Sequence, residues 1–221
     1  MENFSIKNKS CTIIAKRNSG KSYLLKYLLQ YSIKNNDFHK IYVVSPTEKM
    51  NKFYSDIIPE NCIFDRYEDE WILCLIDKMS KINSGKSKES DNDNATHCLV
   101  ILDDCTSDVN MHQMKGLKML YTRCRHSCIS ICVISQNLKS VSPLMRNNSD
   151  YVLTGQLNAA NIDSLCDEYR CPLLSKKEFI QLYKKSTSDY NFFVINNNSV
   201  SENVDNINSY YGIIRAENKN K

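Results

Sequence analysis

The chain has 221 residues, a formal net charge of +4 and 42% hydrophobic residues. This length allows one α/β domain with a sizeable core, and the mild basic surplus permits a nucleic-acid partner without requiring one. The ten cysteines do not indicate a secreted disulfide scaffold, because the N-terminal residues MENFSIKNKS contain no apolar signal segment. No apolar run predicts a membrane segment. We therefore expect a cytoplasmic, non-secreted protein with reduced and mostly buried thiols.

The first informative stretch is an apolar strand followed by a phosphate-binding loop. The run Cys11–Ile14 predicts a buried strand, and the leucines between residues 24 and 29 have the spacing of an amphipathic helix. Between them, residues 15–22 read AKRNSGKS. The order strand, loop, Gly-Lys-Ser, helix is typical of a P-loop, the Walker A motif.

Backbone N–H groups in such a loop, together with the helix N-terminus, bind phosphate oxygens. Lys21 should reach the β- and γ-phosphates, and the Ser22 hydroxyl should complete the Mg²⁺ shell. Ala15 stands where the pattern has its first glycine, and a positive φ there would be strained. The predicted nucleotide-binding residues are Ala15, Lys16, Arg17, Asn18, Ser19, Gly20, Lys21 and Ser22.

The next elements are a strand over 40–46 that Pro46 closes, a short apolar piece at 62–64, and a helix over 68–82 whose apolar stripe predicts core packing. Residues 83–96 are polar and of low complexity, which predicts a mobile surface loop. This loop contains a second Ser-Gly-Lys-Ser, residues 84–87, but no strand precedes it and no apolar helix follows. It is therefore not a second P-loop.

Residues 97–105, HCLVILDDC, predict a central strand that ends in two acids, which is a Walker B pattern. Ligands bind at the carboxyl ends of strands in an open parallel sheet. Asp103 would hold Mg²⁺, and Asp104 would orient or deprotonate the attacking water. The two acids could instead be solvated turn residues, but the upstream P-loop favours the site.

Helix signals over 109–125 lead into a buried strand at Ile129–Ser135, which ends in Gln136. A polar side chain at the tip of that strand can contact the γ-phosphate or the attacking water. Cys124, His126 and Cys128 lie close together, but they lack the ligand spacing of a zinc site.

The C-terminal part has weaker signals. A fifth strand is predicted at 151–154, helices at 158–169 and 176–184, and further strands at 191–196 and 210–215. We expect a single P-loop ATPase domain over 1–221, with the nucleotide core at about 10–155 and C-terminal helices and strands at 156–216. The segment 196–208 is predicted to be a loop and 217–221 a frayed tail.

The order of the motifs predicts a RecA-like, additional-strand P-loop ATPase fold of the α/β class. Such folds have a mainly parallel central sheet flanked by helices, with a strand order of about 5-1-4-3-2 along the chain. Extra C-terminal strands would extend the sheet. Each crossover should be right-handed.

Several segments together suggest a family. They are Ala15 to Ser22, Ser45 to Thr47, Leu99 to Asp104, Arg125 to Ser130, Ser135-Gln136 and Leu144 to Asn148. With these segments the chain resembles the genome-packaging ATPases of large double-stranded DNA viruses and virophages, the poxvirus-like branch of the FtsK–HerA superfamily. The resemblance spans residues 10–155 and is carried most specifically by the Arg-His segment, the strand ending in Gln, and the Arg-x-Asn that follows.

The resemblance implies a ring-forming motor, a pentamer or hexamer, that uses ATP and Mg²⁺ to pull double-stranded DNA into a preformed capsid. Capsid vertex or portal proteins would be partners, and the viral factory of the host cytoplasm, with the virion, would be the location. Arg125 matches the superfamily arginine before the sensor strand and is the first candidate for an arginine finger acting in trans, with Arg146 second. Asp104 stands where many relatives carry glutamate. Because the first strand follows so soon after residue 1, we expect no separate N-terminal DNA-guiding domain.

Two other classes remain open. A P-loop kinase of a small molecule needs an arginine-bearing lid, and the segment 83–96 contains no arginine. A non-hydrolysing nucleotide-binding scaffold of the virion would follow if Ala15 and Asp104 had removed activity. A GTPase is less favoured, because no Asn-Lys-x-Asp segment is present.

Overall fold

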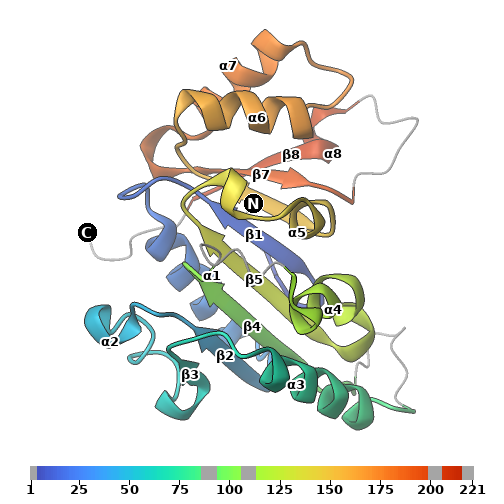
Figure 1. Cartoon of the computed structure of the whole chain (residues 1–221). Coiled ribbons are helices and arrows are strands. Elements are labelled where there is room, and N and C mark those ends of the chain that lie inside the picture. The colour runs from blue at the N-terminus through green and yellow to red at the C-terminus, as the bar shows by residue number, and fades with distance from the viewer. Residues whose placement is uncertain (1–3, 86–93, 106–112, 199–205, 216–221) are drawn as a thin grey trace.

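The computed structural model describes residues 4–85, 94–105, 113–198 and 206–215. Eight strands form one sheet, flanked by helices on both faces (Figure 1). The strands are β1 (Ser10–Ile14), β2 (Lys40–Val44), β3 (Ile63–Phe64), β4 (Cys98–Asp103), β5 (Ile129–Ser135), β6 (Tyr151–Thr154), β7 (Phe192–Asn196) and β8 (Tyr211–Ile214).

The helices differ widely in length, from a single turn to fourteen residues. The α-helices are α1 (Lys21–Lys34), α2 (Glu48–Asn51), α3 (Asp69–Ile82), α4 (Lys115–Arg123), α5 (Pro143–Asn147), α6 (Ala159–Tyr169), α7 (Lys176–Ser186) and α8 (Ile207–Tyr210). Short 3₁₀ turns occupy Glu60–Cys62, Cys124–Ser127, Leu138–Ser140 and Ser188–Tyr190.

The sheet order is β3-β2-β4-β5-β1-β6-β7-β8. The strands from β3 to β6 are parallel to their neighbours, whereas β7 and β8 are added antiparallel beyond β6. The predicted order of the five parallel strands is confirmed, since β6-β1-β5-β4-β2 is the arrangement 5-1-4-3-2. The extra C-terminal strands are confirmed as well.

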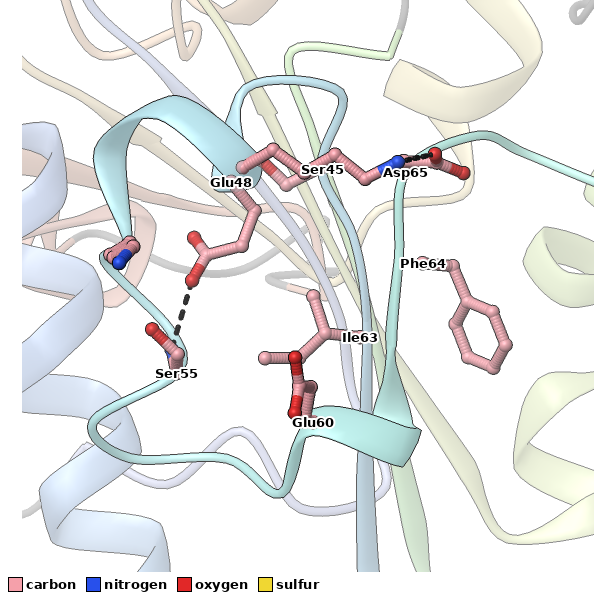
Figure 2. A pocket seen from close by; sticks show the side chains of 9 residues that line it. Ser45, Glu48, Ser55, Glu60, Ile63, Phe64 and Asp65 are labelled. Carbon is pink, nitrogen blue, oxygen red and sulfur yellow. Dashed lines mark hydrogen bonds and ion pairs between the residues drawn. The ribbon is translucent and has the colours of Figure 1, made fainter.

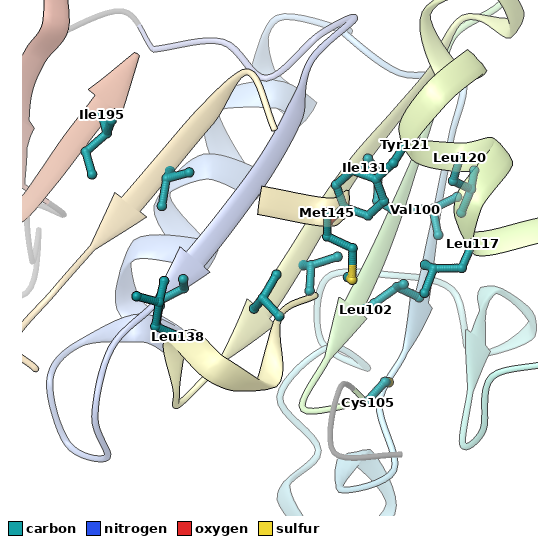
Figure 3. Close-up of a cluster of buried hydrophobic side chains, with 14 of the residues drawn as sticks. Val100, Leu102, Cys105, Leu117, Leu120, Tyr121, Ile131, Leu138, Met145 and Ile195 are labelled. Carbon is teal, nitrogen blue, oxygen red and sulfur yellow. The ribbon is translucent and has the colours of Figure 1, made fainter. Parts of the chain in front are cut away.

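Alternate residues of the central strands supply two cores. Val100 and Leu102 of β4 face one core, which α3, α4, α6 and α7 cover, while Leu99 and Ile101 face the other, which α1 covers. Figure 3 shows part of the first core, where Leu117 of α4 packs near the β4 side chains. Both faces of the sheet are therefore buried, which explains why the central strands read as continuous apolar runs.

Some predicted boundaries need correction. The predicted surface loop 83–96 is too wide, because Asn83 and Ala95 are buried and the Asn83 side chain exchanges two hydrogen bonds with the backbone of Thr96. Residues 86–93 of that loop lie outside the described residues, as do 106–112 of the predicted helix 109–125. A helical turn, α8, occupies the end of the predicted loop 196–208.

The cysteines whose side chains the structure describes are free thiols, and all of them except Cys74 are buried. Across the described residues, no helix is both long and apolar enough to cross a bilayer.

Candidate nucleotide-binding site

The predicted site residues follow three neighbouring strands. The loop 15–22 follows β1, the acids Asp103 and Asp104 end β4, and Gln136 follows β5. Because β4, β5 and β1 are parallel and adjacent, their carboxyl ends meet at one edge of the sheet. The topology thus brings the loop, the acid pair and the glutamine together, as predicted.

The loop 15–22 is a compact turn that leads into α1. Asn18 and Gly20 have left-handed backbone angles, with φ of 58° and 88°, and Gly20 adopts this conformation without steric cost. The Lys21 ammonium donates to the carbonyl oxygens of Ala15 at 2.6 Å and Lys16 at 2.9 Å. Burial lowers the pKa of Lys21 below its ordinary value, although Asp104 and Asp103 oppose the shift. Lys21 therefore spans the space that the loop encloses.

Ala15 is buried, and its φ is not positive. Alanine in place of the usual glycine therefore does not strain the backbone at this position. Residues far along the chain hold the loop in place. Gly155 donates its N–H to the Ile14 carbonyl at 3.0 Å, and Lys16 donates its N–H to Gln156 at the same distance. These contacts were not predicted, because nothing near residue 155 marks it as a partner of the loop.

Tyr190 is a further contact that sequence analysis missed. Its side chain lies 3.5 Å from the position that a Cβ on Gly20 would take. Tyr190 is exposed and, like Asp189, has a left-handed φ. The segment between α7 and β7 thus lies directly against Gly20, the glycine of the loop.

A chain of hydrogen bonds joins the loop to the acids. Arg17 Nε donates to Gln136 Oε1 at 3.1 Å, and Gln136 Nε2 donates to Asp104 Oδ2 at 3.0 Å. Asp104 has a φ of 52°, a left-handed conformation that aspartate adopts more readily than most residues. Gln136 therefore links Arg17 to Asp104 and fixes one oxygen of its carboxylate.

Asp103 has different surroundings. The Tyr54 hydroxyl donates to Asp103 Oδ2 at 2.8 Å. Burial raises the pKa of Asp103 to about 6, and the bond from Tyr54 opposes that shift. Among the described residues, no donor reaches the other carboxylate oxygen. Asp103 and Asp104 are therefore held by different partners, Tyr54 and Gln136, which is compatible with different roles for the two acids.

A pocket of about 680 Å³ lies at the same edge of the sheet, beyond β2 and β3. It is lined by Ser45, Glu48, Lys49, Lys52, Ser55, Glu60, Ile63, Phe64 and Asp65, and Figure 2 shows Glu48 and Ser55 joined across it. None of these lining residues belongs to the predicted site. Glu48, one of the lining residues, accepts from the Tyr54 N–H, and the Tyr54 hydroxyl donates to Asp103.

Arg125 lies away from these groups. It precedes β5, so it lies on the side of the sheet where the parallel strands begin, opposite the loop 15–22. Its guanidinium forms an ion pair with Asp150, whose side chain is fully buried and also accepts from the Ser10 N–H at 2.7 Å. The Arg125 side chain remains 57% exposed. The structure thus gives Arg125 a structural partner and leaves much of it at the surface.

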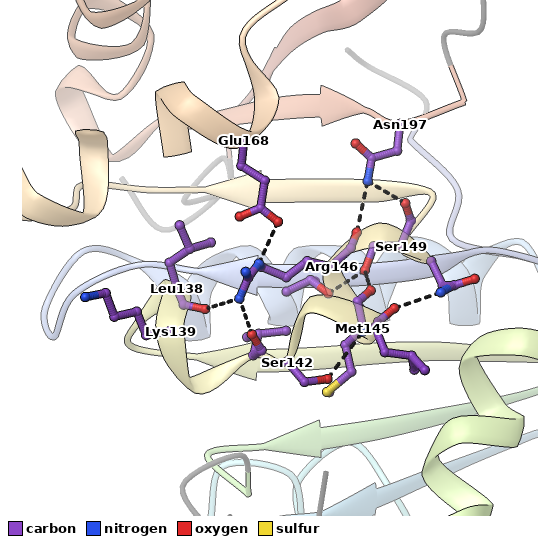
Figure 4. Close-up of polar contacts among 12 residues, drawn as sticks. Leu138, Lys139, Ser142, Met145, Arg146, Ser149, Glu168 and Asn197 are labelled. Atoms are coloured by element: carbon purple, nitrogen blue, oxygen red, sulfur yellow. Dashed lines mark hydrogen bonds and ion pairs between the residues drawn. The ribbon is translucent and has the colours of Figure 1, made fainter. Parts of the chain in front are cut away.

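Arg146 on α5 is more enclosed, with a side chain 15% exposed (Figure 4). Its Nε donates to Glu168 of α6 at 2.7 Å, and its Nη1 donates to the carbonyl oxygens of Leu138 at 3.2 Å and Val141. Arg146 therefore joins α5 and α6 to the turn that follows Gln136.

The fold is shared with solved viral proteins. The structure aligns with the genome packaging NTPase B204 from Sulfolobus turreted icosahedral virus 2 in complex with AMP, with a TM-score of 0.65 and 14% identity over 96% of this chain and 98% of that chain. The DNA-packaging ATPase B204 from Sulfolobus Turreted Icosahedral Virus aligns with a TM-score of 0.63 and 16% identity over 95% and 98% of the two chains. At such identities, the likeness concerns the fold alone.

Sequence comparison adds relatives and a family. The uncharacterized protein 075L of Invertebrate iridescent virus 6 is 29% identical over 201 residues, which are 90% of this chain and 74% of that protein. The family model described as Poxvirus A32 protein matches residues 2–217, nearly the whole chain. The resemblance found in the sequence is thereby confirmed, and the chain belongs to the poxvirus A32 protein family.

Proposed function

We propose that this protein is an ATPase that drives double-stranded DNA into a preformed viral capsid. The observation that carries the proposal is the hydrogen-bonded series Arg17–Gln136–Asp104, which joins the loop 15–22 to an acid pair at one edge of the sheet. A phosphate-binding loop near two carboxylates and a glutamine is suited to nucleotide hydrolysis, since these groups can hold the phosphates, a metal ion and the attacking water. Membership of the poxvirus A32 protein family, together with a fold shared with solved packaging ATPases, is consistent with this proposal.

The residues present fit a Mg²⁺–ATP complex. Backbone N–H groups of residues 15–22 would bind the phosphates, and Lys21 would leave its two carbonyl partners to contact the β- and γ-phosphates. Hydroxyl and carboxylate oxygens are the ligands that Mg²⁺ prefers, and Ser22 and Asp103 supply them. Asp103 has one oxygen bound by Tyr54 and one to which no donor comes within the described residues, so it can accept a cation.

Asp104 is the residue proposed to act on the attacking water. Its carboxylate would accept a proton from that water, while the bond from Gln136 holds it in orientation. The Gln136 amide, shared between Arg17 and Asp104, would also orient the water or the γ-phosphate. The metal, when bound, would neutralise charge that develops on the phosphate oxygens.

In this proposal the working form is a homo-oligomeric ring, a pentamer or hexamer, acting with capsid vertex or portal proteins in the viral factory of the host cytoplasm or in the virion. An arginine from a neighbouring subunit would complete each site. Arg125 remains the first candidate, because its side chain is 57% exposed and lies on the side of the sheet away from its own loop 15–22, where it can face another subunit.

The test is ATP turnover measured with and without linear double-stranded DNA. We expect DNA to stimulate turnover, and Lys21→Ala to abolish it and to weaken nucleotide binding sharply. Lys26→Ala is the matched control, because Lys26 is exposed on the same helix. DNA-independent transfer of phosphate to a small acceptor would indicate a kinase, and absence of turnover would indicate a scaffold.

A further inference from the structure

We propose that Tyr54 and Glu48 are positioning residues for Asp103, and that they set its affinity for Mg²⁺. The inference rests on the proposed function, which assigns Asp103 to the metal. Neither residue belongs to a motif, and both come from the segment between β2 and β3.

Tyr54 reaches Asp103 from a distant part of the chain. The two residues are 49 positions apart, yet the phenol hydroxyl donates to Asp103 Oδ2 at 2.8 Å. Tyr54 is only 1% exposed, so its ring cannot swing away from the carboxylate without leaving the core. The contact fixes the rotation of the carboxylate and directs its second oxygen away from Tyr54.

Glu48 in turn fixes Tyr54. Its Oε1 accepts from the N–H groups of Tyr54 and Ser55, both at 2.9 Å, and its Oε2 accepts from Phe53 at 3.0 Å. Lys52, with a left-handed φ of 46°, turns the backbone so that these three N–H groups converge on one carboxylate. Glu48 is 8% exposed, and a largely buried carboxylate that accepts three bonds is held rigidly.

The hydrogen bond of Tyr54 differs from that of a buried tyrosine whose hydroxyl simply bonds to nearby backbone groups. Tyr211 provides the comparison, because its hydroxyl donates to the Tyr169 carbonyl and accepts from the Cys171 N–H, each at 2.7 Å. Both partners of Tyr211 are backbone groups away from the site. Tyr54 instead donates its hydroxyl to the carboxylate of Asp103 at the end of β4, and no donor among the described residues reaches the other oxygen of this carboxylate.

The experiment compares Tyr54→Phe with Tyr211→Phe, which remove one buried hydroxyl each and keep the rings. The readout is the Mg²⁺ concentration that half-saturates binding of a fluorescent, non-hydrolysed ATP analogue. We expect Tyr54→Phe to raise it by about tenfold or more, since loss of a partner behind a metal ligand typically has that effect. Binding in EDTA should not change, and Tyr211→Phe should behave as wild type.

A double variant separates positioning from general structural support. In an Asp103→Asn background, Tyr54→Phe should have no further effect on the Mg²⁺ dependence, because both changes act through one carboxylate. Glu48→Gln, which keeps the size of the side chain, should move the Mg²⁺ dependence in the same direction and provides a second variant if Tyr54→Phe does not fold.

Unchanged Mg²⁺ dependence in Tyr54→Phe, or in Glu48→Gln where that variant stands in for it, would overturn the inference. The inference would also be overturned if Tyr54→Phe changed the Mg²⁺ dependence equally in the wild-type and Asp103→Asn backgrounds. Neither result would contradict the proposed function, provided that the wild-type protein hydrolyses ATP. A wild-type protein that neither binds nor hydrolyses Mg²⁺–ATP would instead contradict the proposed function, and the inference with it.

Discussion

The Cβ of Ala15 occupies space that a side chain at position 155 would need. A Cβ built on Gly155 would lie 2.8 Å from the Ala15 Cβ and 2.9 Å from the Phe192 ring, both closer than real Cβ contacts allow. The loop therefore tolerates alanine in place of its first glycine because the neighbouring strand end carries glycine instead. The loop at Ala15 and the segment at Gly155 can therefore still approach each other closely, because the glycine lies at position 155 and not at position 15.

Gly155→Ala should destabilise the protein by about 1–3 kcal/mol and weaken nucleotide binding, because overpacking at this point displaces the loop 15–22. Ala15→Gly in the same chain should restore part of the loss, since one of the two clashes disappears while that with Phe192 remains. Thermal unfolding and nucleotide titration measure both effects. Wild-type stability of Gly155→Ala would contradict the packing argument.

Asp103→Asn should stabilise the nucleotide-free protein at pH 8. The pKa of Asp103 is raised to about 6 in the folded protein against an ordinary value of 3.8, so ionisation costs folding free energy as the pH rises through this window. The gain should be roughly 1–3 kcal/mol at pH 8 and should vanish near pH 4. Chemical unfolding in EDTA at both pH values measures it, with Asp56→Asn, an exposed aspartate, as control. Equal gains at both pH values would show that the stabilisation is not due to the charge.

Asp104→Asn should bind Mg²⁺–ATP normally and lose turnover, whereas Asp103→Asn should weaken the Mg²⁺-dependent part of binding. The two acids have different partners, Gln136 and Tyr54, and only Asp104 is proposed to act on water. Magnesium titrations of nucleotide binding, combined with single-turnover assays, distinguish the variants. Identical behaviour of the two variants would show that Asp103 and Asp104 do not have separate roles.

Arg125→Ala should bind ATP yet lose most turnover, by about 10³- to 10⁵-fold if it acts as a finger in trans. The ion pair adds a second effect, because Asp150 would remain buried without its cation, which should also lower stability. Asp150→Asn separates the two effects: it breaks the same pair and should lose stability while keeping turnover.

Mixing tests whether Arg125 acts in trans. Rings containing both Arg125→Ala and Lys21→Ala subunits should recover partial activity, because some interfaces combine an intact loop with an intact arginine. No recovery in rings that demonstrably contain both subunits would exclude this role. Recovery with Arg146→Ala in its place would transfer the role to Arg146, which would first have to leave Glu168 and its two carbonyl partners.

Deletion of Ser87 to Asn94 should leave folding and ATPase activity almost unchanged. The ends of the segment are already held together by the two hydrogen bonds between Asn83 and Thr96, at 2.8 and 3.0 Å, so a shorter connection closes at little entropic cost. Soluble yield and thermal unfolding measure the outcome. Loss of soluble protein would mean that the deleted residues contribute to the core.

The sheet order and the meeting of loop, acids and Gln136 were predictable, because apolar runs and motif order constrain a parallel sheet strongly. Tyr54, Gly155 and Asp150 could not be found in this way. Tyr54 meets Asp103 across 49 positions, and Gly155 matters only because Ala15 lies beside it. Asp150 precedes a strand like many surface acids, and only the fold shows that it is buried. Such contacts depend on which strand ends become neighbours in the fold. The local pattern of apolar and polar residues in the sequence does not encode this.

In the part of the chain that the structure describes, both outer strands of the sheet are short, with two residues in β3 and four in β8. Unpaired strand edges invite pairing with another chain, and short ones offer few hydrogen bonds for it. Edge-to-edge association is thereby disfavoured, although the molecule is built around a wide and apolar sheet. In the proposed ring, copies of the chain would then meet through helices and loops, and each subunit could tilt against its neighbour without breaking a shared backbone ladder.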